Sequence, residues 1–153
     1  MPRFTSIFLA LFLLAPCFAA VPVIFDTDMG NDIDDAMALA MLHSLESRGE
    51  CRLLGVTLTN AHPDAVQYIR MVNRFYGRPE IPVGVASRAI AQGDRDTFLS
   101  KPLAAAPIAL RKETRIAPEP AVMLLRRLLA ESAEKVVIVQ VGFSTSLAAL
   151  LES

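Results

Sequence analysis

Five aspartates within ten positions are the strongest chemical signal in this sequence of 153 residues. This acidic cluster runs from Asp26 to Asp35 and holds five of the eight aspartates of the chain. Carboxylates so close together repel one another unless positive charge compensates them. A helix N-terminus supplies only about half a unit charge. We therefore expect a hard divalent cation with oxygen ligands, Ca²⁺ or Mg²⁺, to bind the cluster.

Helix capping is the structural alternative for these acids. Asp32 or Asp34 at a helix N-cap would be ordinary chemistry, but capping uses one or two side chains and not five. An EF-hand loop is excluded, because a loop that begins at Asp26 or Asp28 has no Gly at its sixth position and no Glu at its twelfth. Capping therefore explains single members of the cluster and leaves the others without a role.

The cluster lies where a buried strand is expected to pass into a helix. Residues 21–25 are mostly β-branched or aromatic and favour a strand. From Ile33 to Leu45, apolar residues that include Met37 and Met41 recur at helical spacing and predict a helix with this face buried. Further strands are expected at 52–59, 81–85 and 135–141, and further helices at 63–76, 119–133 and from 145 onwards.

Alternation of strands and helices predicts an α/β fold, a doubly wound and mostly parallel sheet with helices on both faces. The run 135–141 is almost continuously β-branched, which predicts a strand buried on both faces. Residues 87–118 are irregular and predict a long loop. Ligands of such sheets bind at the carboxyl ends of the strands. Three segments should meet there, namely 26–35, 57–62 and 141–146.

The first twenty residues have the pattern of a secretory signal peptide. A basic start precedes an apolar run from Ile7 to Phe18, which ends in small residues. The run is shorter than a comfortable membrane span. We therefore expect residues 1–20 to be removed, leaving 21–153 as a secreted or periplasmic domain with no membrane attachment. A retained N-terminal anchor is the alternative.

Composition excludes two broad classes of protein. Fifteen Lys and Arg against sixteen Asp and Glu give a formal net charge of −1, whereas binding to nucleic acid by bulk charge needs a basic surface. Two cysteines cannot form a disulfide scaffold, and only Cys51 lies outside the expected signal peptide. We therefore expect no nucleic-acid partner and no disulfide scaffold.

The motif around the acidic cluster resembles that of a known enzyme family. The strand is followed by Asp-Thr-Asp-x-Gly at 26–30 and by Asp-Asp-Ala-x-Ala-Leu at 34–39. This pattern is similar to the signature of the nucleoside hydrolases, the inosine/uridine-preferring N-ribohydrolases, with residues 31–32 as an insertion. Weaker matches lie at 54–57 and 139–147, so the resemblance extends over the chain after the expected signal peptide.

The resemblance implies calcium-dependent hydrolysis of the N-glycosidic bond of ribonucleosides, which releases base and ribose. It makes Asp28, Asp35 and the backbone carbonyl of Val141 ligands of one Ca²⁺. It also makes Asp28 the general base that deprotonates the attacking water. The ribose-binding residues that it implies are Asp34 and either Asn60 or, in a gapless alignment, His62.

Chains of this family continue for about the same length again beyond the position of Ser153. That further half supplies another calcium-binding Asp and a His that protonates the leaving base. We therefore expect residues 21–153 to form the N-terminal part of a nucleoside hydrolase-like domain, either as a fragment of a longer product or as a truncated protein with weak or no activity. An exposed sheet edge could then pair with a second copy as a homo-oligomer.

Two other functions fit part of the sequence. Phosphatases of the haloacid dehalogenase type also have Asp-x-Asp after a strand, with Asp26 as nucleophile and a bound Mg²⁺. That reading leaves Asp34 and Asp35 unexplained. The other alternative is a non-catalytic fragment that binds calcium or ribose.

Overall fold

The computed structural model describes residues 19–153 except for 31, 61, 91–98 and 112–116. The expected signal peptide lies almost wholly outside the described residues, so its removal stays a prediction. Among the described residues, no helix has both the length and the apolar character needed to cross a membrane.

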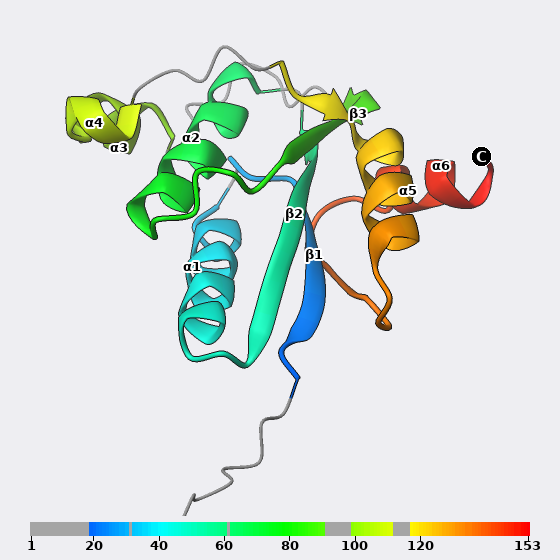
Figure 1. Ribbon diagram of the computed structural model, residues 1–153. Coiled ribbons are helices and arrows are strands. Elements are labelled where there is room, and N and C mark those ends of the chain that lie inside the picture. The colour runs from blue at the N-terminus through cyan, green and yellow to red at the C-terminus, as the bar shows by residue number, and fades with distance from the viewer. Residues whose placement is uncertain (1–18, 31, 61, 91–98, 112–116) are drawn as a thin grey trace, which may run out of the picture.

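One parallel sheet organises the molecule (Figure 1). Its strands are β1 (Val21–Thr27), β2 (Cys51–Asn60), β3 (Val83–Ile90), β4 (Glu119–Pro120) and β5 (Val137–Gln140). They lie in the order β4-β3-β2-β1-β5, and the strand pairs are parallel. β1 is therefore flanked by β2 on one side and β5 on the other. The predicted α/β fold with a parallel sheet is confirmed.

Helices cover both faces of this sheet (Figure 1). One face carries α1 (Asp34–Ser47) and α2 (Pro63–Phe75), and the other carries α5 (Ala121–Glu131) and α6 (Thr145–Leu151). Pro63 is the first residue of α2, where its missing N–H costs nothing. The segment predicted as a long loop is partly ordered instead, because β3 extends into it and two short helices, α3 (Ser100–Ala105) and α4 (Ile108–Arg111), contact α2.

The buried face of α1 differs from the predicted one. Met37 and Met41 are 64% and 61% exposed, whereas Leu39 and Leu42 are buried in the core. Two apolar stripes at helical spacing run along α1, and the stripe with the leucines packs against the sheet. The predicted face was therefore wrong, since periodicity alone does not choose between two such stripes.

β5 is less buried than its sequence predicts. Val137 is 44% exposed, and Ile138 and Val139 are half-buried on opposite faces of the sheet. The prediction of a strand buried on both faces was therefore wrong for the described chain. The physical reason is position, because among the described residues β5 pairs only with β1 and so lies at an edge.

A buried polar contact links α1 to α2. His43 and Asn73 are almost completely buried, and His43 Nε2 lies 2.9 Å from Asn73 Oδ1. The imidazole ring also stacks on Tyr76 with 4.7 Å between ring centres. Burial lowers the pKa of His43, so the neutral ring is favoured. His43 therefore has a structural role in holding the two helices together.

Candidate functional site

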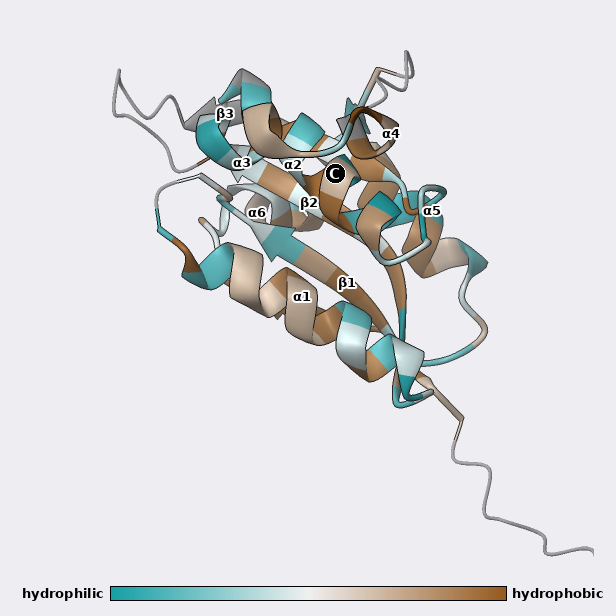
Figure 2. Ribbon diagram, turned by 90° about the vertical axis from the view of Figure 1, so that its left-hand side faces the viewer, coloured by the Kyte–Doolittle hydropathy of each residue, from teal (hydrophilic) through white to brown (hydrophobic). Residues whose placement is uncertain are grey.

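The carboxyl ends of β1, β2 and β5 meet at one edge of the sheet. Asp26 lies opposite Thr57 of β2 and opposite Gln140 of β5. The backbone N–H of Val141 donates to the Asp26 carbonyl oxygen at 2.9 Å. In Figure 2, β1 is brown along its length and turns teal at its arrowhead, so apolar packing gives way to polar chemistry there. The predicted meeting of these three strand ends is confirmed.

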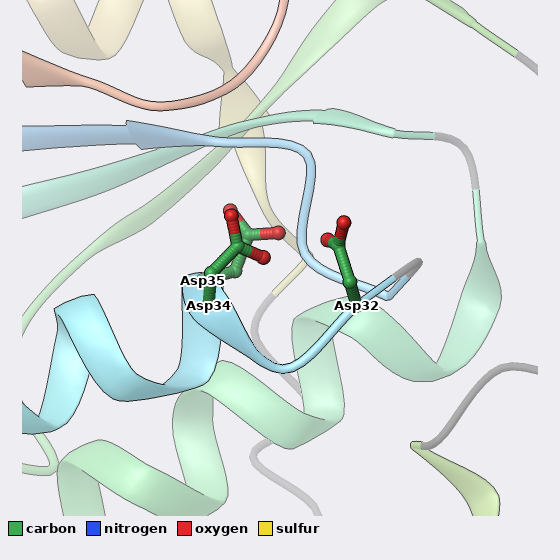
Figure 3. Close-up of side chains that lie close together, drawn as sticks. All are labelled: Asp32, Asp34 and Asp35. Carbon is green, nitrogen blue, oxygen red and sulfur yellow. The ribbon is translucent and has the colours of Figure 1, made fainter.

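Three carboxylates gather just beyond this edge (Figure 3). One carboxylate oxygen from each of Asp32, Asp34 and Asp35 lies within 4.8 Å of the other two. Asp34 and Asp35 occupy the first turn of α1, and Asp32 faces them from the preceding loop. Such an oxygen-only set of donors suits a hard cation such as Ca²⁺ or Mg²⁺.

Mutual repulsion is strong in this cluster. The pKa of Asp32 is raised, first by its hydrogen bond with Asp34 and then also by the negative charges of Asp34 and Asp28. The charge of Asp28 also raises the pKa of Asp26 and of Asp35. Asp28 therefore lies within electrostatic reach of Asp26, Asp32 and Asp35, and added positive charge would relieve the repulsion.

Asp35 is held in place by a threonine of the preceding strand. The Thr27 hydroxyl donates to Asp35 Oδ1 and accepts the backbone N–H of Met29 at 3.1 Å. Asp35 is only 2% exposed. Burial raises its pKa to about 6, against the lowering effect of the Thr27 hydrogen bond. The carboxylate is thus buried and oriented, and its ionisation costs free energy when no cation compensates it.

Asp26 lies deeper than the other acids. It is completely buried, and Oδ1 accepts the Thr57 hydroxyl at 2.5 Å. Its Oδ2 atom and the Ser146 hydroxyl make no hydrogen bond of good geometry within the described chain, although Ser146 lies close enough to lower the pKa of Asp26. Burial is the larger effect and raises that pKa to about 6. A carboxylate so enclosed cannot attack a phosphate, which argues against the phosphatase alternative.

The capping alternative is not supported at α1. The N-cap of α1 is Ile33, and no side chain makes a capping hydrogen bond there. Ile33 has helical backbone angles, while Asp32 engages Asp34 in the cluster. Asp34 in the first turn still interacts favourably with the helix dipole.

The two candidates for the ribose-binding residue, Asn60 and His62, lie in different structural elements. Asn60 ends β2, and its side chain lies outside the described part of the structure. His62 precedes α2 as its N-cap, where Nδ1 accepts the backbone N–H of Asp64 at 3.2 Å. His62 therefore supports the turn after β2, and the assignment of a ribose-binding residue between these two positions stays a prediction.

Sequence reasoning missed the hydroxyl side chains that surround the acids. Thr57 and Thr59 are completely buried at the carboxyl end of β2. Residues two apart in a strand point to the same face, so the pair Thr57-x-Thr59 beside an acidic strand end was the available signal. Asp32 belongs to the predicted acidic cluster, but it is not among the metal ligands that the resemblance implies.

The fold is a parallel α/β sheet with carboxylates at the carboxyl ends of its central strands. In α/β proteins of this class, this edge of the sheet is where ligands bind. The family model for inosine-uridine preferring nucleoside hydrolases matches residues 23–153. The chain therefore belongs to the inosine-uridine preferring nucleoside hydrolase family, as the motif predicts.

Solved structures of longer proteins share the fold. An inosine-uridine preferring nucleoside hydrolase from Bacillus anthracis has 24% identity and a TM-score of 0.63, over 86% of this chain and 45% of that one. The effector protein XOO4466 has 23% identity and a TM-score of 0.69, over 87% and 39%. The type III effector protein XopQ, complexed with adenosine diphosphate ribose, has 23% identity and a TM-score of 0.69, over 87% of this chain and 38% of that one. The chain thus spans less than half the length of these structures. No curated protein sequence matches it.

Proposed function

We propose that this chain forms the metal- and ribose-binding part of a calcium-dependent nucleoside hydrolase, which cleaves the N-glycosidic bond of ribonucleosides. The observation that carries the proposal is the cluster of Asp32, Asp34 and Asp35 oxygens within 4.8 Å in a chain of this family. The similar structure complexed with adenosine diphosphate ribose, a ribosyl compound, supports a ribosyl ligand. We also propose that the N-terminal twenty residues direct export from the cytoplasm.

The residues present fit a hard cation. All candidate donors are oxygens, and the buried Asp26 Oδ2 lacks a hydrogen-bond partner within the described chain. We assign Asp28, Asp35 and the Val141 carbonyl as ligands, with Asp32 and Asp34 beside them. When bound, calcium would neutralise this charge, hold adjacent ribose hydroxyls and acidify a water molecule.

Each acid then has a separate role toward substrate. Asp28, half-buried at the end of β1, accepts the proton of the attacking water as general base. Asp34 is exposed and accepts hydrogen bonds from the ribose hydroxyls. Glycoside hydrolysis passes through an oxocarbenium-like transition state, whose positive charge at the sugar is stabilised by surrounding carboxylates.

Calcium titration with the purified chain tests the metal site. Asp35→Asn keeps the shape of the side chain but removes its charge, and we expect at least a roughly tenfold weaker Kd for calcium by calorimetry. Glu131→Gln is the matched control, because it removes one charge from a 62% exposed side chain on α5. Equal affinity of the wild type and Asp35→Asn would contradict the assignment.

Release of ribose from inosine and uridine, with and without chelator, tests the reaction. Chelator-sensitive release supports the proposed hydrolysis, and release that is insensitive to chelator contradicts its calcium dependence. Binding of calcium and ribose without turnover would instead support a non-catalytic binding module.

A further inference from the structure

The backbone hydrogen bonds between β1 and the chain after β5 end at the Asp26 carbonyl. The Asp26 carbonyl accepts two backbone N–H groups, from Val141 at 2.9 Å and from Gly142 at 3.3 Å. After this point the chain leaves β5 toward α6, and the regular ladder between the two strands ends. The next polar groups along each strand therefore need another partner.

Thr59 supplies that partner from the other side of β1. Its hydroxyl donates to the Thr27 carbonyl at 3.2 Å and accepts the backbone N–H of Phe143 at 3.3 Å. Thr59 is completely buried near the carboxyl end of β2, which is the neighbour of β1 opposite β5. One hydroxyl thus bridges the backbones of two segments, which lie before Asp28 and after Val141.

Gly142 shows how tightly these segments meet. A Cβ atom at Gly142 would lie 2.6 Å from the backbone N of Asp28, 2.6 Å from the backbone C of Thr27 and 2.9 Å from Thr59 Oγ1. These distances are shorter than van der Waals contact, and two of the three atoms belong to backbone that cannot rotate away. The relative position of Asp28 and the 141–143 turn therefore depends on this junction of Thr27, Thr59 and Gly142.

We propose that Thr59 is a positioning residue, which sets the distance between Asp28 and the Val141 carbonyl through its two hydrogen bonds. The inference deepens the proposed function, in which these two groups from different strands bind the same cation. The single hydroxyl oxygen of Thr59 donates to one backbone and accepts from the other. Valine has the same shape but makes neither of these two hydrogen bonds, whereas serine keeps the bridge.

Calcium titration of two variants of the full chain tests this role. We expect Thr59→Val to weaken the Kd for calcium by about tenfold or more, in the range of changes around metal ligands, and Thr59→Ser to stay within about threefold of wild type. Ile69→Ala is the control for loss of stability, because Ile69 is completely buried in the core and lies on α2, outside the junction of Thr27, Thr59 and Gly142. It should lower the Tm and leave the calcium Kd unchanged.

The outcomes separate this inference from the calcium site itself. Rescue by serine with loss in valine supports the positioning role, and calcium affinity in Thr59→Val equal to wild type overturns it. Failure of the wild type to bind calcium overturns the calcium site. Amide hydrogen exchange at Phe143 then tests the hydrogen bond from Phe143 to Thr59 independently of calcium binding. Faster exchange in Thr59→Val than in Thr59→Ser supports the bridge, and equal rates contradict it.

Discussion

Buried hydroxyl groups hold the acids of this site in fixed orientations. Thr27 bonds to Asp35, and Thr57 bonds to Asp26. Each of these side chains is at most 2% exposed. A buried carboxylate with a single donor remains costly to ionise, so its protonated form is favoured in the absence of other positive charge. Ionised Asp26 and Asp35 therefore oppose folding at neutral pH when no cation is bound.

Replacing Asp26 by asparagine tests this cost. The pKa of Asp26 is raised from 3.8 to about 6 on folding. The folded state thus binds this proton more tightly than the unfolded state. The stability that Asp26 contributes is therefore fully present below about pH 4 and is lost as the pH rises through about 6. Asp26→Asn mimics the protonated form. We expect it to increase the free energy of unfolding by about 2 kcal/mol at pH 7.5 and to have little effect at pH 4, measured by urea denaturation in chelator.

Glu131→Gln serves as the control for that measurement, since this side chain is 62% exposed. It should have the same small effect at both pH values. If Asp26→Asn has the same stability relative to wild type at pH 4 and at pH 7.5, then burial does not shift the pKa of Asp26 as described.

At the scale of elements, the turn after β5 tolerates no side chain at Gly142. We expect Gly142→Ala to lower the free energy of unfolding by more than about 3 kcal/mol and to weaken calcium binding, because backbone must move away from the new Cβ. Gly49→Ala is the matched control, as Gly49 has a φ of +75° and no atom near its Cβ. It should cost about 1 kcal/mol through backbone strain alone, with an unchanged Kd for calcium.

Disrupting the contact between α1 and α2 should lower stability without changing calcium affinity. His43→Ala removes a buried ring, its stacking on Tyr76 and its hydrogen bond with Asn73. We expect thermal denaturation to show a loss of about 2–4 kcal/mol. Calcium affinity should not change, because His43 lies toward the far end of α1 from the acids. Ser44→Ala, at the exposed neighbouring position, should be close to neutral. Weaker calcium binding in His43→Ala would show that the helix pair affects the site.

The elements themselves were largely predictable from sequence, and their contacts were not. β-branched runs located the strands, and the strand–helix alternation gave the parallel sheet. Periodicity chose the wrong face of α1, because Met37 and Leu39 belong to two stripes that both have helical spacing. The bridge from Thr59 to Phe143 joins residues 84 positions apart and has no local signal. Asp34 and Asp35 were recognisable as candidate site residues from sequence because their carboxylates are neighbours in it.

At the scale of the whole molecule, the outer edge of β5 offers unpaired backbone groups within the described chain. Val137 and Val141 expose apolar surface there, at 44% and 43%. Open edges of this kind favour pairing between chains. We expect sedimentation velocity to show association that increases with concentration. Val137→Lys should reduce it, whereas Met123→Lys, at a 61% exposed position on α5, should not. A monomer at all concentrations would contradict this expectation.

The order of strands also determines when the site can form during folding. β1 pairs with β2 early along the chain, but its other neighbour is β5, so that Val23 lies opposite Val137 from the distant end of the described chain. Closing so long a loop costs conformational entropy before the contacts between β1 and β5 can form. Contacts between residues far apart in sequence therefore slow folding. The Val141 carbonyl can join the acids only after that closure. In refolding experiments, therefore, helical signal should recover before calcium affinity, and calcium should speed none of the earlier phases.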